Sequence, residues 1–257
     1  MNLYLSGKVA LVTGSGSQIG FGHATVVTMA KEGCDVIVND INLEAAEQTA
    51  DEIRKLGRKA IAVKADVGEK TQVNQMVSTA ISEFGRIDIL VNNAGAGGAG
   101  GPIHLTREED WEKTINLLFT GVMNCTKAVL PGMLERRYGK IVNIASGLGR
   151  TGSPNNSVYA SCKGAVITFT KSVAAEVADK GINVNCVCPG LSTTNFLRDA
   201  NGEVRSPEMV EDVRKGIPLK RLTEPQDVAN MVTFLVSDVS SDIVGQTIGV
   251  NGGNSMI

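Results

Sequence analysis

The stretch that decides the fold is Lys8–Ala24, which reads KVALVTGSGSQIGFGHA. It opens with a short apolar run, Lys8–Thr13, and passes through a glycine-rich turn into a segment that favours a helix. Such a turn lets the backbone approach a pyrophosphate, and the N-terminus of the following helix stabilises the negative charge. A glycine-rich turn alone is equally compatible with an ordinary tight turn. Here the strand before it and the helix after it supply the context that phosphate binding requires.

Similar apolar runs recur along the chain and are separated by amphipathic stretches. The further runs are Asp35–Asn39, Lys59–Val63, Ile87–Val91, Lys140–Ala145, Ile182–Val187 and Thr247–Val250. They are continuously apolar rather than alternating, which is typical of strands covered on both faces. This order predicts an α/β fold, a single doubly wound Rossmann-type domain over residues 1–257 with a parallel sheet of about seven strands and helices on both faces.

The composition argues against several classes of function. Of the 257 residues 42% are hydrophobic and the net charge is −2, so we expect no nucleic acid partner. No apolar stretch approaches the roughly 20 residues of a membrane span, and the N-terminus lacks the pattern of a signal peptide. The cysteines have no framework spacing, and we expect them to be reduced thiols in a cytoplasmic protein: Cys34, Cys125, Cys162, Cys186 and Cys188. Because the only histidines are His23 and His104, we expect no metal site.

The glycine-rich turn resembles the fingerprint of the short-chain dehydrogenase/reductase family, which is Thr-Gly, three residues, Gly-x-Gly. Counting three residues from Gly14 puts Gln18 where the middle glycine belongs. A loop enlarged by two residues instead gives Gly20-Phe21-Gly22, like the family's Gly-Ile-Gly, and places Gly33 at the family's usual distance. We therefore expect an enlarged loop. The cofactor contacts implied here are Gly14, Ser17, Gln18, Ile19, Gly20, Phe21 and Gly22.

Asp40 decides the expected cofactor. It follows the second apolar run, close to the roughly 20 residues beyond the glycine turn at which dinucleotide-binding folds place an acidic residue. A carboxylate there accepts hydrogen bonds from the adenosine ribose and repels a 2′-phosphate. No Arg or Lys between Gly14 and Gly22 would hold such a phosphate. The alternative is a solvated Asp at a strand end, and the spacing favours NAD.

Three further segments match the family and imply more cofactor contacts. Asp66-Val67 resembles its adenine-contacting pair, Asn92–Gly95 its Asn-Asn-Ala-Gly turn, and Pro189-Gly190 its loop beside the nicotinamide. The contacts implied are Asp66, Val67, Asn93, Ala94, Gly95, Pro189, Gly190, Ser192 and Thr194. The resemblance covers Lys8–Gly253, with a cofactor half of about 1–140 and a catalytic half with a lid of about 141–257.

The expected lid is Leu191–Gly216, which is longer than a usual connection and mostly polar. Its candidate substrate contacts, for an apolar body and a phosphate, are Phe196, Leu197, Arg198 and Arg205. An ordinary amphipathic lid with solvated arginines is the alternative.

The catalytic half contains the family's serine, tyrosine and lysine as Ser146, Tyr159 and Lys163. Lys163 follows Tyr159 by four residues, so the two side chains share one face of a helix. The resemblance implies that Tyr159 is the general base, because a neighbouring ammonium stabilises its phenolate. Ser146 would hold the substrate oxygen. Lys163 would also bind the nicotinamide ribose, with Tyr159 beside the nicotinamide ring.

One member of the family's catalytic set is missing. Many relatives have an Asn seven residues after a helical Trp, whereas position 118 of this chain is Leu118. Trp111 and Gly121 keep the family's spacing, and the nearby Asn116 lies two residues early. Either the helix is distorted so that Asn116 takes the place of the missing residue, or the water relay attributed to it is built otherwise.

These residues together predict an NAD-dependent oxidoreductase that transfers a hydride between a secondary alcohol and NAD. Segments such as Leu130–Arg137 look like those of bacterial hydroxyacyl-CoA and cyclic alcohol dehydrogenases. The alternatives are a 3-oxoacyl-carrier reductase, which Asp40 disfavours because biosynthetic reductases usually draw on NADPH, and a catalytically silent NAD-binding subunit. The family is usually tetrameric, so we expect a homotetramer, or a hetero-oligomer with a homologue. The small residues expected at its helix contacts are Ala160, Ser161, Gly164 and Ala165.

Overall fold

The computed structural model describes residues 2–192, 194 and 207–256. Phe196, Leu197, Arg198 and Arg205, the expected substrate contacts of the lid, lie outside the described residues. The rest of the predicted lid is described at its two ends, as Leu191, Ser192 and Thr194 and as the helix α8 (Pro207–Gly216).

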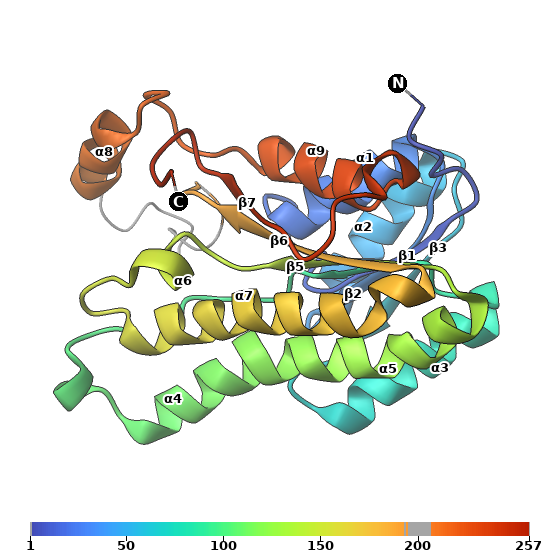
Figure 1. Ribbon diagram of the computed structural model, residues 1–257, viewed down its shortest axis with the longest axis horizontal. Helices are drawn as coiled ribbons and strands as arrows, with labels where there is room; N and C mark the ends of the chain where they lie inside the picture. The colour runs from blue at the N-terminus through green and yellow to red at the C-terminus, as the bar shows by residue number, and fades with distance from the viewer. Residues whose placement is uncertain (1, 193, 195–206, 257) are drawn as a thin grey trace.

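The described part of the chain contains a sheet of seven parallel strands in the order β3-β2-β1-β4-β5-β6-β7 (Figure 1). The strands are β1 (Val9–Val12), β2 (Asp35–Asp40), β3 (Ala60–Lys64), β4 (Ile89–Asn92), β5 (Gly139–Ile144), β6 (Ile182–Pro189) and β7 (Thr247–Val250). Each lies within two residues of an apolar run predicted from the sequence, and the doubly wound Rossmann-type fold is confirmed. The strand order reverses between β1 and β4, which is the point where such folds open a crevice at the carboxyl ends of their strands.

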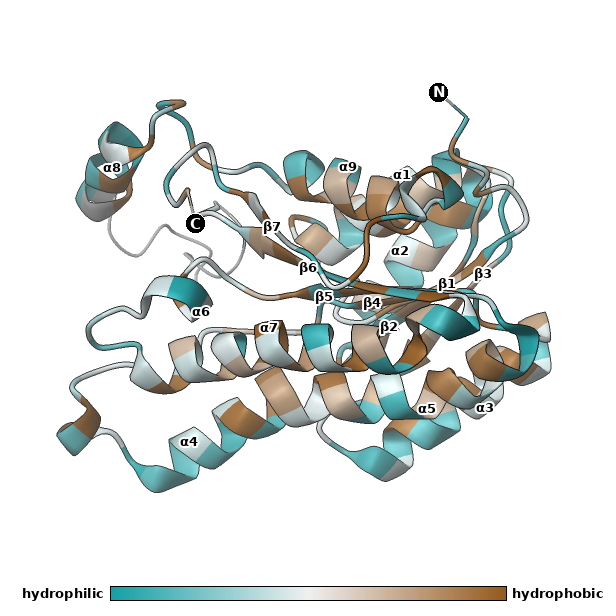
Figure 2. Ribbon diagram, viewed as in Figure 1, coloured by the Kyte–Doolittle hydropathy of each residue, from teal (hydrophilic) through white to brown (hydrophobic). Residues whose placement is uncertain are grey.

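Helices cover both faces of the sheet (Figure 1). On one face lie α1 (Phe21–Lys31), α2 (Leu43–Lys55) and α9 (Pro225–Leu235), and on the other lie α3 (Lys70–Phe84), α5 (Gly121–Arg136) and α7 (Ser157–Val177). Because successive side chains of a strand point to opposite faces, Ala10 and Val12 pack in the first layer, and Val9 and Leu11 in the second. The hydrophobic colouring in Figure 2 therefore concentrates along the strands and the inner sides of the helices.

A helix of unusual length runs along the second face. It consists of α4 (Glu108–Ile115), a π-helical turn (Asn116–Thr120) and α5. Among the described residues, this run alone is long and apolar enough to cross a membrane, a test that core helices of globular proteins also pass. Its apolar side chains belong to the core, since Cys125, Val129 and Met133 pack with α3 and α7. The π-helical turn lies in the region where the family's Asn is missing.

A close backbone contact joins α7 to the short helix α6 (Leu148–Thr151). A Cβ atom built on Gly149 would lie 2.6 Å from the carbonyl carbon of Lys163, and one built on Gly164 would lie 3.1 Å from the Gly149 oxygen. We expected Gly164 to be small in order to contact a second subunit. The structure also gives a reason within the chain, because a Cβ atom at Gly149 would meet the backbone of α7 and one at Gly164 would crowd the backbone of α6. This contact holds the segment after β5 against the helix that carries Tyr159.

Candidate active site

The predicted catalytic residues meet at the carboxyl end of β5. Ser146 follows this strand, and Tyr159 and Lys163 lie in the first two turns of α7. The side chains of Ser146 and Tyr159 are hydrogen-bonded. The ammonium of Lys163 donates to the carbonyl oxygen of Ile144 at 2.8 Å and lies 5.9 Å from the centre of the Tyr159 ring. The structure thus brings Ser146, Tyr159 and Lys163 together, with the ammonium close enough to act on the phenol through space.

Burial shifts both of the ionisable groups toward their neutral forms. It raises the pKa of Tyr159, and the hydrogen bond from Ser146 opposes this shift. Burial lowers the pKa of Lys163 from its ordinary 10.5 to about 8, because few groups near the ammonium replace its lost hydration. Tyr159 is therefore not a ready base in the chain by itself. Additional positive charge beside the phenol is needed to favour the phenolate near neutral pH.

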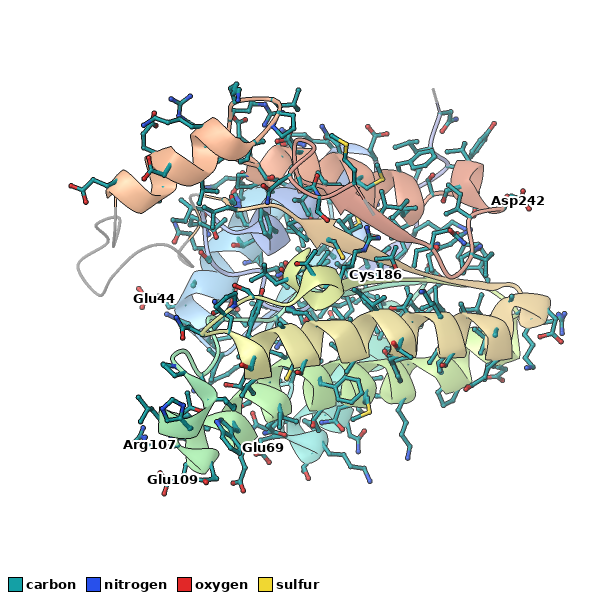
Figure 3. All side chains as sticks on the ribbon, turned by 60° about the vertical axis from the view of Figure 1, so that its left-hand side comes forward. Glu44, Glu69, Arg107, Glu109, Cys186 and Asp242 are labelled. Carbon is teal, nitrogen blue, oxygen red and sulfur yellow. The ribbon has the colours of Figure 1, made fainter. Side chains whose placement is uncertain are left out.

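Two thiols of β6 lie beside this cluster. Cys186 and Cys188 point to the same side of the strand and are fully buried, and their interaction lowers the pKa of Cys188 and raises that of Cys186. Figure 3 brings the carboxyl ends of the strands forward and labels Cys186 on the sheet above α7. The described residues contain no group of three or more His, Cys, Asp and Glu side chains able to hold a metal ion.

The glycine-rich turn follows the second of the two registers. Helix α1 begins at Phe21 with Gly20 as its N-cap. A Cβ atom on Gly22 would lie 2.5 Å from the carbonyl oxygen of Gly14, so Gly22 is the glycine that lets the helix pack directly on the end of β1. The two additional residues consequently belong to the loop between Gly14 and Gly20. Within that loop the amide of Gly20 donates to the carbonyl oxygen of Ser17 at 2.8 Å.

Contacts between β1 and β4 hold this turn in place. The hydroxyl of Thr13 accepts the amides of Asn93 and Ala94, each at 3.0 Å. The side-chain amide of Asn93 donates to the carbonyl oxygens of Thr13 and Gly14 at 2.8 and 2.9 Å. Sequence reasoning missed Thr13 as a site residue, although it is the first residue of the Thr-Gly fingerprint. Its hydroxyl is what joins the glycine turn to the Asn-Asn-Ala-Gly turn.

Asp40 closes the other side of the crevice. Its two carboxylate oxygens accept the backbone amides of Gly16 at 2.9 Å and Asn42 at 3.0 Å. The carboxylate is held in one orientation and keeps lone pairs for two ribose hydroxyls. Gly16 was not among the expected site residues. Nothing local in the sequence indicates its contact with Asp40, which exists only because the enlarged loop folds back over β2.

The adenine and nicotinamide ends of the expected cofactor site are also formed. The Asp66-Val67 pair is held by the side-chain amide of Asn124, which donates to the Val67 carbonyl at 3.0 Å. At the other end the amide of Gly190, which follows Pro189, donates to the carbonyl of Val250. The hydroxyl of Ser192 is buried and has no hydrogen-bond partner among the residues that the structure describes. A buried hydroxyl of this kind is costly unless a ligand completes it, so the donor set fits a nicotinamide carboxamide.

The remaining expected residues lie around the same crevice. Ile19 and Gln18 are exposed on the loop, Gly95 lies next to the ammonium of Lys163, and Thr194 is half-buried beyond Ser192. A Cβ atom on Gly95 would lie 3.9 Å from the Lys163 nitrogen. The expected residues therefore follow the carboxyl ends of the strands, from β2, which ends at Asp40, to β6, which ends at Pro189.

The structure also shows where Leu118 and Asn116 lie, the two residues considered for the role of the family's Asn. Leu118 is 1% exposed, and its Cδ2 would lie 3.3 Å from a Cβ atom on Gly95, so it borders the same space as the Lys163 ammonium. Asn116 instead packs on Gly68, where its amide nitrogen would lie 2.4 Å from a built Cβ atom. The helix is distorted here by the π-helical turn, as the first alternative required. The distortion does not, however, bring Asn116 to Tyr159 and Lys163.

Comparisons with known proteins agree with this arrangement. A family model described as enoyl-(acyl carrier protein) reductase matches residues 14–255. The chain is 39% identical over 262 aligned residues to a 3-oxoacyl-(acyl-carrier-protein) reductase of a Synechocystis species, with 98% of each chain covered. It is 40% identical over 253 residues to subunit BbsD of the (2S)-((R)-hydroxy(phenyl)methyl)succinyl-CoA dehydrogenase of Thauera aromatica, again with 98% of each chain covered.

A solved structure is similar over the same extent. The crystal structure of an NAD⁺-bound xylitol dehydrogenase aligns with a TM-score of 0.89 at 32% sequence identity, covering 97% of this chain and 100% of that one. The family model, the relatives and this structure all span nearly the whole chain, as the site geometry does. This protein belongs to the short-chain dehydrogenase/reductase family of oxidoreductase enzymes.

Proposed function

We propose that this enzyme transfers a hydride between a secondary alcohol and NAD. The observation that carries the proposal is the assembly of Ser146, Tyr159 and Lys163 at one end of a crevice whose other end carries Asp40. The hydroxyl and phenol are hydrogen-bonded to each other, as two groups that share one substrate oxygen would be. NAD rather than NADP is supported by the carboxylate of Asp40, which is fixed by two backbone amides.

The residues divide the proton chemistry among them. Ser146 donates a hydrogen bond to the substrate oxygen, and Tyr159 accepts the proton of the alcohol as a phenolate. When bound, the oxidised nicotinamide supplies the hydride acceptor and a positive charge beside the phenol. Lys163 favours the phenolate by its own charge, which the carbonyl of Ile144 holds within 5.9 Å of the Tyr159 ring. In the reverse direction Tyr159 returns the proton to the alcohol oxygen.

For the substrate we propose a hydroxyacyl-CoA or a cyclic secondary alcohol. The similarity to a hydroxyacyl-CoA dehydrogenase subunit at 40% identity supports this class. The second candidate is reduction of a 3-oxoacyl group on a carrier, favoured by the Synechocystis relative at 39% identity. The third candidate is a catalytically silent NAD-binding subunit. Leu118 favours this candidate, whereas the assembled Ser146, Tyr159 and Lys163 argue against it. We place the enzyme in the cytoplasm, where its five free cysteines would remain reduced.

Cofactor choice is the first test. NAD should bind at least tenfold more tightly than NADP, and Asp40→Ala should narrow this ratio. Removing the charged acceptor of the ribose hydroxyls should weaken NAD binding about tenfold or more. Calorimetric titration of both nucleotides measures the ratio. Equal affinity of the unaltered enzyme for NAD and NADP would show that Asp40 does not select the cofactor.

The second test separates Tyr159 from Asn116. Tyr159→Phe removes the proton acceptor, so turnover should fall by the roughly 10²–10⁴-fold typical of a lost general base. Asn116→Ala should keep most activity, because this side chain packs on Gly68 and not on the catalytic cluster. NADH formation is followed with a panel of cyclic alcohols and hydroxyacyl-CoA thioesters, and 3-oxoacyl thioesters are offered with NADH and NADPH. Near-normal turnover of Tyr159→Phe would overturn the mechanism, and no turnover of any substrate would favour the silent subunit.

The third test uses the buried ammonium of Lys163. Its pKa is about 8 in the folded chain and 10.5 ordinarily, so the folded state binds fewer protons than the unfolded state between these values. The free energy of unfolding should therefore gain a contribution from this lysine as the pH rises from about 8 to 10.5. The Lys163→Met variant has no buried ammonium and lacks this dependence on pH. It should therefore be more stable than the unaltered chain at pH 7, by a margin that shrinks above pH 8. Urea unfolding of both proteins across this range measures the margin, and parallel curves would contradict the shift.

The fourth test concerns assembly. We propose a homotetramer that pairs the helices near Trp111–Glu135 and Tyr159–Asp179. Ser161 is exposed and Ala165 half-buried on α7, which leaves small residues available for a close contact between subunits. Light scattering at micromolar concentration should give four times the mass of one 27.0 kDa chain. A monomer would refute the proposal.

A further inference from the structure

The enlarged loop lies against α2, in the space beside the carboxylate of Asp40. Gly16, a residue of this loop, is buried between α2 and the end of β2. A Cβ atom built on it would lie 3.0 Å from the backbone nitrogen of Ala46 and 3.0 Å from both Cβ and Cγ of Asp40. These contacts are tighter than nearly all real Cβ contacts, so a side chain at this position would require Asp40 or α2 to shift by a few tenths of an ångström. The loop backbone therefore fills the gap between the end of β2 and the first turn of α2.

The loop is held by the hydrogen bond from the Gly16 amide to Asp40 and by contacts of Gln18 and Thr49. The amide nitrogen of Gln18 donates to the carbonyl oxygen of Gly16 at 3.0 Å and to the hydroxyl of Thr49 at 2.8 Å. Thr49 lies on α2 and is fully buried, and its hydroxyl donates in turn to the carbonyl of Ala45 at 3.2 Å. Gln18 thus connects the tip of the loop to the interior of the helix that flanks Asp40.

Three amides at the start of α2 are already engaged. The amide of Asn42 donates to Asp40 at 3.0 Å, that of Ala45 to the Asn42 side chain at 3.2 Å, and that of Ala46 to the Asn42 carbonyl at 3.1 Å. NADP differs from NAD by a phosphate on the ribose hydroxyl that an acid at the position of Asp40 would hold. Such a phosphate needs space and donors at this place. The loop backbone fills the space beside Asp40, and the amides of Asn42, Ala45 and Ala46 are engaged.

We propose that the enlarged loop, fastened by the contact between Gln18 and Thr49, is a second barrier to NADP in addition to the charge of Asp40. The inference rests on the proposed use of NAD. Gln18 is a positioning residue here, since it acts on the cofactor through Gly16. Loss of the carboxylate removes the charge and the hydrogen bond to Gly16, but the contact between Gln18 and Thr49 still holds the loop, so the phosphate lacks space. Opening the loop alone leaves the phosphate facing a negative charge. Only both changes together admit NADP.

A double-mutant cycle measures this coupling. Asp40→Ala, Gln18→Ala and the double variant are compared by calorimetric titration with NAD and NADP. Gln18→Ala should change NADP affinity by less than about twofold in the unaltered background. In the Asp40→Ala background it should tighten NADP binding about 3–10-fold, the range expected when the contact that closes the site is one hydrogen bond. Gln48→Ala is the matched control, because Gln48 is an exposed glutamine on the same helix.

Thr49 tests the same contact from the helix side. Thr49→Val removes the hydroxyl at nearly constant volume and should reproduce the effect of Gln18→Ala in the Asp40→Ala background. Thr49→Ser keeps the hydroxyl and should not. A merely structural weakening of α2 would not distinguish NAD from NADP, so the ratio of the two affinities is the decisive readout.

The outcomes separate this inference from the proposed cofactor. If Gln18→Ala adds no more NADP affinity than Gln48→Ala while the unaltered enzyme prefers NAD, the loop is not a barrier and the proposed cofactor stands. If Asp40→Ala alone binds NADP as tightly as the unaltered enzyme binds NAD, charge is the whole barrier and the inference is wrong. Equal affinity of the unaltered enzyme for both nucleotides would overturn both proposals.

Discussion

The arrangement of the site depends on the contact between the first glycine turn and the end of β4. A single hydroxyl, that of Thr13, accepts two amides of the neighbouring turn, and Asn93 returns two hydrogen bonds to the carbonyls of Thr13 and Gly14. These bonds join the two strands between which the strand order reverses. The connections after β1 and β4 leave toward opposite faces from this point, which is where folds of this kind open a crevice. Asp40 lies on one side of the contact and Tyr159 on the other.

The buried ammonium of Lys163 costs the folded state stability but serves the proposed function. An ammonium that is buried against a strand carbonyl, beside an apolar Leu118, loses hydration that its single backbone acceptor only partly replaces. The same low polarity strengthens the effect of that charge on the nearby phenol. Leu118 borders the same space as the Lys163 ammonium without supplying a polar group. The site thus depends on Ser146, Tyr159 and Lys163 without a side-chain amide at position 118.

Glycines determine the geometry on both sides of the crevice, each through a different contact. Gly22 lets α1 approach β1, Gly16 lets the loop pass between Asp40 and α2, and the pair Gly149 and Gly164 lets α6 lie on α7. In each case a Cβ atom would meet backbone, which cannot move aside as a flexible side chain could. The loop between Gly14 and Gly20 gained two residues without loss of the helix start at Phe21, because the additional length folds toward α2 and leaves the contact at Gly22 intact.

The sequence by itself determined the strands, the register of the glycine turn and the grouping of Ser146, Tyr159 and Lys163. Buried strands and helical faces are periodic and local, so continuous apolar runs and a spacing of four residues are sufficient to find them. Only the tertiary structure decided that Gly16 binds Asp40 and that Gly164 packs on Gly149. The tertiary structure also decided that Asn116 packs on Gly68 while Leu118 borders the space of Lys163. These contacts join residues that are distant along the chain. Their partners follow from how the helices and loops lie on the sheet, which no local pattern of residues specifies.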